Sequence, residues 1–440
     1  MRTSRRLSVI VVTTAVLVAA AGPAVGRSTG GTRRVSVATG GAQANGMSWG
    51  GAISGDGRWV AFDSQASTLV AGDTNGQPDV FVHEVGAKST WRVSVGPAGV
   101  QANGSSVSPS ISGDGRYVVF SSSASNLVPD DTNNQDDVFV HDIWTGTTRR
   151  VSLDAAGHQL HHGSFGSAIS PDGGYVAFTS RSPDVVPGDT NDLNDVFLRN
   201  LATGATRRVS VGTGGTQVSD GFGGGAPAIS AYGASVVFTS TGGDVVPGDT
   251  NGVDDVFVHD VATSRTERVS VATDGTQGTN PSSTGGAPSI SADGTRIAFQ
   301  TYAAEFAPGD TNNARDDFVR DRRTGRTLLV SESVTGGVGA SYSDFPVISP
   351  DGRWVVFDSF APDLVDGDVN GAGDVFVRDL NKGVTWLVTR GYRGPQGNGD
   401  SYALGISAKA SRVVYRSQAT NLVKQKDTNN TSDMFVTDFR

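Results

Sequence analysis

The 440-residue chain contains no cysteine, and this absence excludes several kinds of chemistry. Without thiols the protein can form neither a disulfide framework nor a thiolate metal site, and it offers no cysteine for lipid attachment. Long apolar runs are missing too, because beyond the N-terminal segment no stretch approaches the ~20 apolar residues of a membrane-spanning helix. No segment shows a sustained helical period either. We therefore expect an all-β protein without a membrane span.

Basic residues are scarce as well. The chain has 35 Lys and Arg against 44 Asp and Glu, which gives a formal net charge of -9. Proteins that bind nucleic acid use clustered Lys and Arg to contact the phosphates. The acidic balance therefore argues against nucleic acid as a partner.

The N-terminus has the pattern of an export signal. Three arginines lie within the first six residues, an apolar segment covers residues 7–21, and small residues follow near position 26. We predict a signal peptide over residues 1–26 and a single mature domain over residues 27–440. The protein is then expected to be secreted, or otherwise extracytoplasmic in the cell envelope, by either the general or the twin-arginine route.

An acidic phrase that runs into an apolar strand occurs seven times. In its second copy it reads Asp-Thr-Asn-Asn-Gln-Asp-Asp-Val-Phe-Val over residues 131–140, and the copies begin 58 to 61 residues apart. Such a period indicates a repeat architecture. Each copy holds four short strand candidates, which in the second copy are residues 109–112, 117–121, 137–141 and 149–153. Continuous apolar runs in the middle two indicate a sheet that is buried on both faces.

The ends of the chain indicate how the repeats close. A fourth-strand sequence at residues 33–37 precedes the first complete copy, and the last copy stops after its third strand at residues 434–436. We therefore predict a seven-bladed β-propeller of four-stranded antiparallel blades, with the N-terminal strand completing the last blade. The first two strands of most copies are joined by Asp-Gly, as in Asp114-Gly115, which predicts tight primed hairpin turns.

The phrase Ser-x-Asp-Gly-Arg-x-Val-x-Phe at residues 112–120 and 349–357 resembles the WD40-like repeat of the TolB propeller family. The resemblance covers essentially the whole predicted mature chain at the level of the repeat. It implies a propeller and, more loosely, a periplasmic scaffold that binds partners. TolB proteins carry an α/β domain before a six-bladed propeller, whereas residues 27–32 leave no room for that domain and seven copies are present.

The acidic phrase has two interpretations. Closely spaced side-chain oxygens resemble the start of a calcium loop, but Ca²⁺ takes six to eight oxygens, and the position four after the first Asp never holds a carboxylate. The residue three after that Asp is always Gly, Asn or Asp, which tolerate positive φ, and the leading Asp can close an Asx-turn. A turn is therefore favoured and structural calcium is the alternative. The candidate ligands are Asp73, Asn75, Asp79, Asp131, Asn133, Asp137, Asp189, Asn191, Asp195, Asp249, Asn251, Asp255, Asp310, Asn312, Asp316, Asp368, Asn370, Asp374, Asp427, Asn429 and Asp433.

The connections between copies vary in length, from 18 residues between Val35 and Ile53 to 21 between Val269 and Ile290. In a blade, these connections and the acidic phrase lie at the same end, and length variation on one face of a repeat protein often marks its binding face. Most of them carry a Gln, which we expect to bond with loop amides.

Two groups of histidines stand out. Three in one connection could ligate a transition metal, although a solvated loop is the favoured interpretation; they are His158, His161 and His162. Three others share one strand position and are expected to be exposed; they are His83, His141 and His259.

No sequence motif identifies a reaction, and no catalytic or cofactor-binding residue is assigned. The favoured function is a non-catalytic propeller that binds a protein or a surface glycan through its loop-rich face, where Phe165, Phe222 and Tyr342 could supply contacts. A purely structural envelope protein remains open. The alternative is a hydrolase or lyase that acts in the central channel, with Asp220 and Asp344 as its unrepeated carboxylates.

Overall fold

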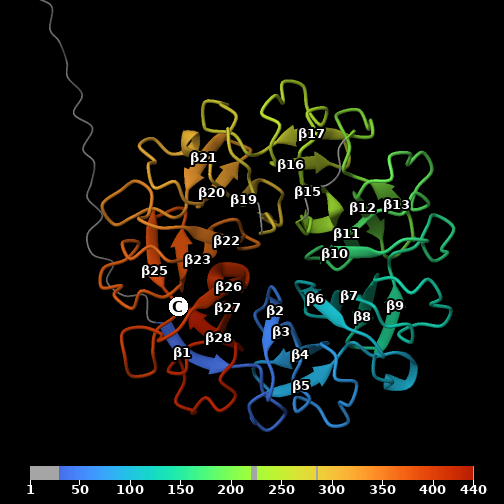
Figure 1. Cartoon of the computed structure of the whole chain (residues 1–440), viewed down its shortest axis with the longest axis horizontal. Coiled ribbons are helices and arrows are strands. Elements are labelled where there is room, and N and C mark those ends of the chain that lie inside the picture. The colour runs from blue at the N-terminus through green and yellow to red at the C-terminus, as the bar shows by residue number, and fades with distance from the viewer. Residues whose placement is uncertain (1–28, 220–224, 284–285, 440) are drawn as a thin grey trace, which may run out of the picture.

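A computed structural model describes residues 29–219, 225–283 and 286–439. These residues form seven four-stranded antiparallel sheets that are arranged in a ring (Figure 1). The prediction of a seven-bladed β-propeller is confirmed. Within these ranges no helix has the length and hydropathy to cross a membrane. The predicted signal peptide lies outside the described residues.

Six blades consist of strands that follow one another in the sequence. Blades 1 to 3 comprise β2 (Ser48–Ile53), β3 (Trp59–Ser64), β4 (Asp79–Glu84) and β5 (Ser89–Arg92); β6 (Ser106–Ile111), β7 (Tyr117–Ser122), β8 (Asp137–Asp142) and β9 (Thr147–Arg150); and β10 (Ser164–Ile169), β11 (Tyr175–Ser180), β12 (Asp195–Asn200) and β13 (Thr206–Arg208). Blades 4 to 6 comprise β14 (Ala228–Ile229), β15 (Ser235–Ser240), β16 (Asp255–Asp260) and β17 (Arg265–Arg268); β18 (Ser289–Ile290), β19 (Arg296–Thr301), β20 (Asp316–Asp321) and β21 (Arg326–Leu329); and β22 (Ser343–Ile348), β23 (Trp354–Ser359), β24 (Asp374–Asp379) and β25 (Val384–Leu387). Short 3-10 turns cover η1 (Pro97–Gly99), η2 (Ala231–Gly233), η3 (Ala304–Phe306) and η4 (Ala408–Ala410).

Blade 7 joins the two ends of the chain. It contains β26 (Ser401–Ile406), β27 (Arg412–Ser417) and β28 (Asp433–Phe439), and its outer strand is β1 (Thr29–Arg34). The register pairs Thr32 with Thr437 and Arg34 with Phe435. The predicted closure by the N-terminal strand is therefore confirmed, and main-chain hydrogen bonds hold the ring shut.

The core lies between the blades. Both faces of β7 and β8 are buried, as their continuous apolar sequences predict. Within a blade, Phe120 stacks on Phe139 with ring centroids 6.0 Å apart. Between blades, Val80 of blade 1 packs in one cluster with Val118 of blade 2. Each blade thus stabilises its neighbours by removing apolar surface from water, at roughly 25 cal/mol per Å².

The axis of the propeller is apolar where the first strands end. A cavity of about 230 Å³ there is lined by an isoleucine from each of the described blades. They are Ile53, Ile111, Ile169, Ile229, Ile290, Ile348 and Ile406.

The Asp-Gly hairpins differ from the prediction. The loop between β6 and β7 has five residues, and within its Asp114-Gly115 pair only Gly115 has a positive φ, of 75°. The Ser112 hydroxyl donates a hydrogen bond to Asp114 (2.6 Å) and accepts one from the Tyr117 amide (3.0 Å). The prediction of a two-residue primed turn was wrong. The Ser112 hydroxyl accepts the Tyr117 amide in place of a main-chain carbonyl, so regular strand pairing ends earlier and the loop is longer.

Candidate functional site

Two kinds of segment lie at one end of the propeller: the loop between the second and third strands of each blade, and the connection to the next blade. In blade 1 the loop of residues 65–78 follows the second strand, and the connection of residues 93–105 leads to blade 2. Gln101 of the connection bonds with Asp73 of the loop, so the two segments lie side by side. We call the surface formed by these loops and connections in all blades the loop face.

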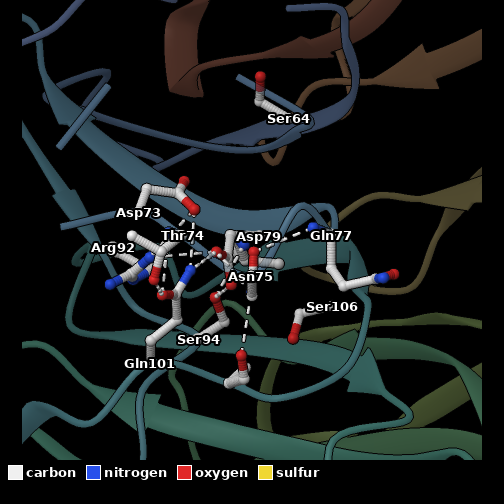
Figure 2. Close-up of polar contacts among 12 residues, drawn as sticks. Ser64, Asp73, Thr74, Asn75, Gln77, Asp79, Arg92, Ser94, Gln101 and Ser106 are labelled. Carbon is white, nitrogen blue, oxygen red and sulfur yellow. Dashed lines mark hydrogen bonds and ion pairs between the residues drawn. The ribbon is translucent and has the colours of Figure 1, made fainter. Parts of the chain in front are cut away.

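In most blades the two carboxylates of the acidic loop are bridged by side chains from the fourth strand and from the next connection, as Figure 2 shows for blade 1. In blade 1, Gln101 Nε2 lies 2.8 Å from Asp73 Oδ1 and 3.2 Å from Asp79 Oδ2, while its Oε1 accepts the Thr74 amide at 3.2 Å. Arg92 Nη1 lies 3.6 Å from Asp73 Oδ1 and 3.2 Å from Asp79 Oδ2. We call these two Asp, the Arg and the Gln the carboxylate clamp. The guanidinium compensates part of the buried negative charge of the two carboxylates.

The asparagine of each loop fixes the turn. Asn75 Oδ1 accepts the Gln77 amide at 2.9 Å, which closes an Asx-turn, and Asn75 Nδ2 donates to the Ala102 carbonyl at 2.9 Å. Gly76 between them has a φ of 66°. Positive φ is confirmed at the corresponding residue of every blade; these residues are Gly76, Asn134, Asp192, Gly252, Asn313, Gly371 and Asn430.

A serine two residues after the clamp arginine ends the fourth strand. In blade 2 the Ser152 hydroxyl donates to Asp137 Oδ1 at 2.6 Å and accepts the Val138 amide at 3.0 Å. The Ser152 hydroxyl thus accepts the Val138 amide in place of a main-chain carbonyl of the fourth strand. For this reason β9 ends at Arg150 rather than at the predicted residue 153.

The clamp recurs around the ring with informative exceptions. In the described residues the arginine is present in five blades, as Arg34, Arg92, Arg150, Arg208 and Arg268, each within 3.4 Å of the second Asp. Blades 5 and 6 have Leu329 and Leu387 at that position, and blade 5 also has Val338 in place of the glutamine. Blade 6 keeps Gln396, whose Nε2 donates to Asp368 at 2.8 Å.

Loss of the arginine changes the electrostatics of the second Asp. Burial raises the pKa of Asp316 and of Asp374 to about 6, and these are the acids of the two blades with leucine. In blade 2, burial also raises the pKa of Asp137, but the Ser152 hydrogen bond and the Arg150 charge oppose that rise. A buried carboxylate without a cation gains a proton more readily, because desolvation disfavours its charged form.

In five blades the predicted Asn donates a hydrogen bond to the second Asp, and in blades 2 and 3 the arginine contacts both predicted Asp side chains. In five blades a guanidinium lies beside the carboxylates where calcium would need oxygen ligands. A search of the described part of the chain for three or more His, Asp or Glu side chains that could hold a metal ion finds no such group. We propose that the 21 residues form turns and join blades. Sequence reasoning missed the arginine, although its constant position, 13 residues after the second Asp in blades 1 to 4, was a usable signal.

The strand histidines are buried, so the expectation that they are exposed was wrong. His83 is 3% exposed, and its Nδ1 lies 2.9 Å from the Thr90 hydroxyl, which donates to the Val37 carbonyl. Burial lowers the pKa of His83 to about 4. His141 and His259 make the same contact with their threonines. These side chains are neutral links to the preceding connection.

The histidines of the third connection lie at the surface. His161 Nδ1 is 2.5 Å from Asp184 Oδ2, and His158 Nδ1 is 3.1 Å from Asp154 Oδ2. Their side chains are 82% and 78% exposed. Each therefore pairs with its own carboxylate, and the two pairs do not share a carboxylate.

The candidate channel carboxylate Asp344 lies in the interface between blades 5 and 6. It is 4% exposed, and its Oδ2 is 2.6 Å from Arg315 Nη2. Burial raises its pKa to about 6. Burial and the charges of Asp344 and Asp358 hold the pKa of Asp317 well above the usual range. Asp317, Asp344 and Asp358 are each 4% exposed or less, and the other candidate, Asp220, lies outside the described residues together with Phe222.

Searches against protein families and curated proteins find no match for this chain. Solved structures do match. An oligogalacturonate lyase in complex with manganese is 12% identical, with 94% of each chain covered and a TM-score of 0.54. The β-propeller domain of the Trilobed protease from Pyrococcus furiosus is 9% identical, with 89% of this chain and 95% of that chain covered and a TM-score of 0.51. Similarities of this order show a shared fold.

TolB proteins are also among the similar structures. TolB from Acinetobacter baumannii is 16% identical over 70% of this chain, with a TM-score of 0.39. This chain spans 58% of the length of that protein. The resemblance is one of propeller repeats.

We predict that calcium leaves the stability of the protein unchanged, because a guanidinium lies beside the carboxylates in five blades and the described residues hold no group of three metal-binding side chains. Thermal melts in millimolar CaCl₂, in MgCl₂ of equal ionic strength and in chelator should coincide within the error of the measurement. A melt that is several degrees higher in calcium alone would restore the calcium interpretation.

We predict that Leu387→Arg reduces the loss of stability with rising pH. The pKa of Asp374 in the folded state is about 6 against an ordinary 3.8, so its stabilising contribution is complete below about pH 4 and is lost as the pH rises through 6. A guanidinium at position 387 should lower that pKa, and the variant should gain roughly 1–3 kcal/mol over the wild type between pH 4 and 7.5. Chemical denaturation measures this difference. Leu387→Gln is the control, and parallel pH profiles for Leu387→Arg and the wild type would refute the idea.

Proposed function

We propose that the protein is a secreted, non-catalytic β-propeller scaffold that binds a protein or a cell-surface glycan through its loop face. The observation that carries this proposal is that the base of each acidic loop is built alike in every blade, whereas the connections beside these loops vary in length and sequence. The asparagine of each loop fixes its base in the same way, by donating to a carbonyl of the next connection, as Asn75 and Asn133 do. A rigid scaffold that presents variable loops is the arrangement in which binding residues are commonly found.

Aromatic side chains at the loop face support this proposal. Tyr302 is 39% exposed and Tyr342 is 37% exposed, and both flank the guanidinium of Arg315 with ring centroids 5.6 and 5.9 Å from its carbon. Tyr342 also stacks on Phe360 at 4.7 Å. Tyrosine and arginine are enriched in interfaces, because they combine apolar contact with hydrogen bonding. This group is preorganised by its own contacts.

The position of Asp344 does not favour the alternative of a channel hydrolase or lyase. Its carboxylate is almost fully buried and paired with Arg315. The segment of residues 1–26, with its export pattern, supports an extracytoplasmic location.

The proposal predicts that the purified protein is retained by cell-envelope material of its source organism. The loop-face variant Tyr302→Ala/Tyr342→Ala should lower retention at least fivefold. The matched control Trp144→Ala/Tyr232→Ala removes two exposed aromatic side chains from the hairpin turns at the opposite end and should bind like the wild type. Protease or periodate treatment of the envelope material separates a protein from a glycan partner. Absence of retention, or equal loss in both variants, would refute the proposal.

A further inference from the structure

Blade 7 differs from the other blades at the start of its acidic loop. In the other blades an apolar pair follows the second strand, and two residues then lead to the first Asp of the loop. In blade 3 these two residues are Pro187 and Gly188. In blade 7 three residues, Lys424-Gln425-Lys426, occupy this place. The connection that precedes this blade is also unusual, because it carries Arg390 and Arg393.

These two segments enclose a groove on the loop face. It has a volume of about 470 Å³ and is lined by Tyr392, Arg393, Gly394, Asn421, Val423 and Lys424. The Tyr392 side chain is 51% exposed, and the Arg393 guanidinium carbon lies 5.7 Å from its ring centroid. The groove therefore presents an aromatic surface beside two cationic side chains.

Hydrogen bonds hold the two walls in place. The Tyr392 amide donates to the Asn421 carbonyl at 2.8 Å. Asn421 Nδ2 donates to the Gln396 carbonyl at 3.0 Å, and Asn421 Oδ1 accepts the Asn398 amide at 3.0 Å. Since one side chain joins both segments, the shape of the groove exists before any ligand binds, which lowers the entropic cost of binding.

The charge of this region is opposite to that of the whole chain. Arg390, Arg393, Lys424 and Lys426 are all exposed, and two of the five lysines of an otherwise acidic chain lie here. The adjacent Asp427 side chain instead bonds within the clamp, where its Oδ1 accepts hydrogen bonds from Gln43 Nε2 (2.9 Å) and from the Asn429 amide, and within the described residues it forms no ion pair with these four cations. A local positive potential on an acidic protein attracts a ligand with a few anionic groups.

We propose that this groove binds an anionic polysaccharide, whose acidic groups contact Arg393 and Lys424 while a sugar ring packs on Tyr392. The inference rests on the proposed function and names a ligand class for the same face. Carboxylate and sulfate groups share the required chemistry. A nucleic acid fits less well, because the net charge of -9 repels an extended phosphate backbone beyond this small patch.

The test is calorimetric titration of the protein with alginate, which is carboxylated, with dextran sulfate and with neutral dextran. We expect binding to at least one anionic polymer, no binding to neutral dextran, and weaker binding as salt rises, because exposed charges are screened. Arg393→Gln/Lys424→Gln should weaken binding at least tenfold. The control Lys88→Gln/Lys409→Gln removes two cations at the opposite end and should change the affinity less than twofold. Tyr392→Ala should weaken polysaccharide binding severalfold.

Several results would overturn the inference. These are the absence of binding to both anionic polymers, equal binding of neutral dextran, tighter binding of a single-stranded oligonucleotide, or wild-type affinity in Arg393→Gln/Lys424→Gln. The envelope assay with the Tyr302/Tyr342 variant is independent of these titrations. If that assay succeeds and the titrations fail, the groove is not the glycan site and the scaffold function stands. If both the envelope assay and the titrations fail, the proposed scaffold function is refuted together with the glycan site.

Discussion

Each blade buries two carboxylates at the base of its acidic loop, and the architecture of the loop face depends on how their charge is compensated. An isolated buried carboxylate is strongly disfavoured, whereas one that is paired and hydrogen-bonded is tolerated. In blade 2, Arg150 supplies the cation from the fourth strand and Gln159 supplies amide donors from the next connection. One set of contacts therefore fixes the loop, ends the strand and orients the connection to the next blade.

The same interaction closes the ring. In blade 7 the clamp joins residues from opposite ends of the chain, because Arg34 and Gln43 contact Asp433 and Gln43 also contacts Asp427. Hydrogen bonds between β1 and β28 run beside it. Closure is thus maintained by the main chain and by a buried charge network together. Where the arginine is replaced, as by Leu387 in blade 6, burial raises the pKa of the second Asp to about 6 and no clamp guanidinium opposes that rise.

Much of the fold was predictable because the repeat is expressed in local residue choices. Blade number, ring closure and the positive φ at residues such as Asn134 all follow from spacing and residue type. Contacts between distant segments were harder to predict. A periodic Arg such as Arg92 looks like an ordinary strand residue until the fold places it beside Asp79. A polar residue such as His83 is expected at the surface from its sequence, and only the fold shows the hydrogen bond with Thr90 that allows its burial. The basic groove required two segments that the sequence separates by about 30 residues.

The central claim is that the guanidinium and the two carboxylates of each clamp stabilise one another inside the protein. A double-mutant cycle in blade 2 tests it most directly, using Asp137→Asn, Arg150→Met and the double variant, with free energies of unfolding measured at neutral pH. Side chains that are 6% exposed or less, as these are, should show a coupling of about 1–3 kcal/mol. The double variant should then be less destabilised than the sum of the single variants. Additive effects within about 0.3 kcal/mol would contradict the account.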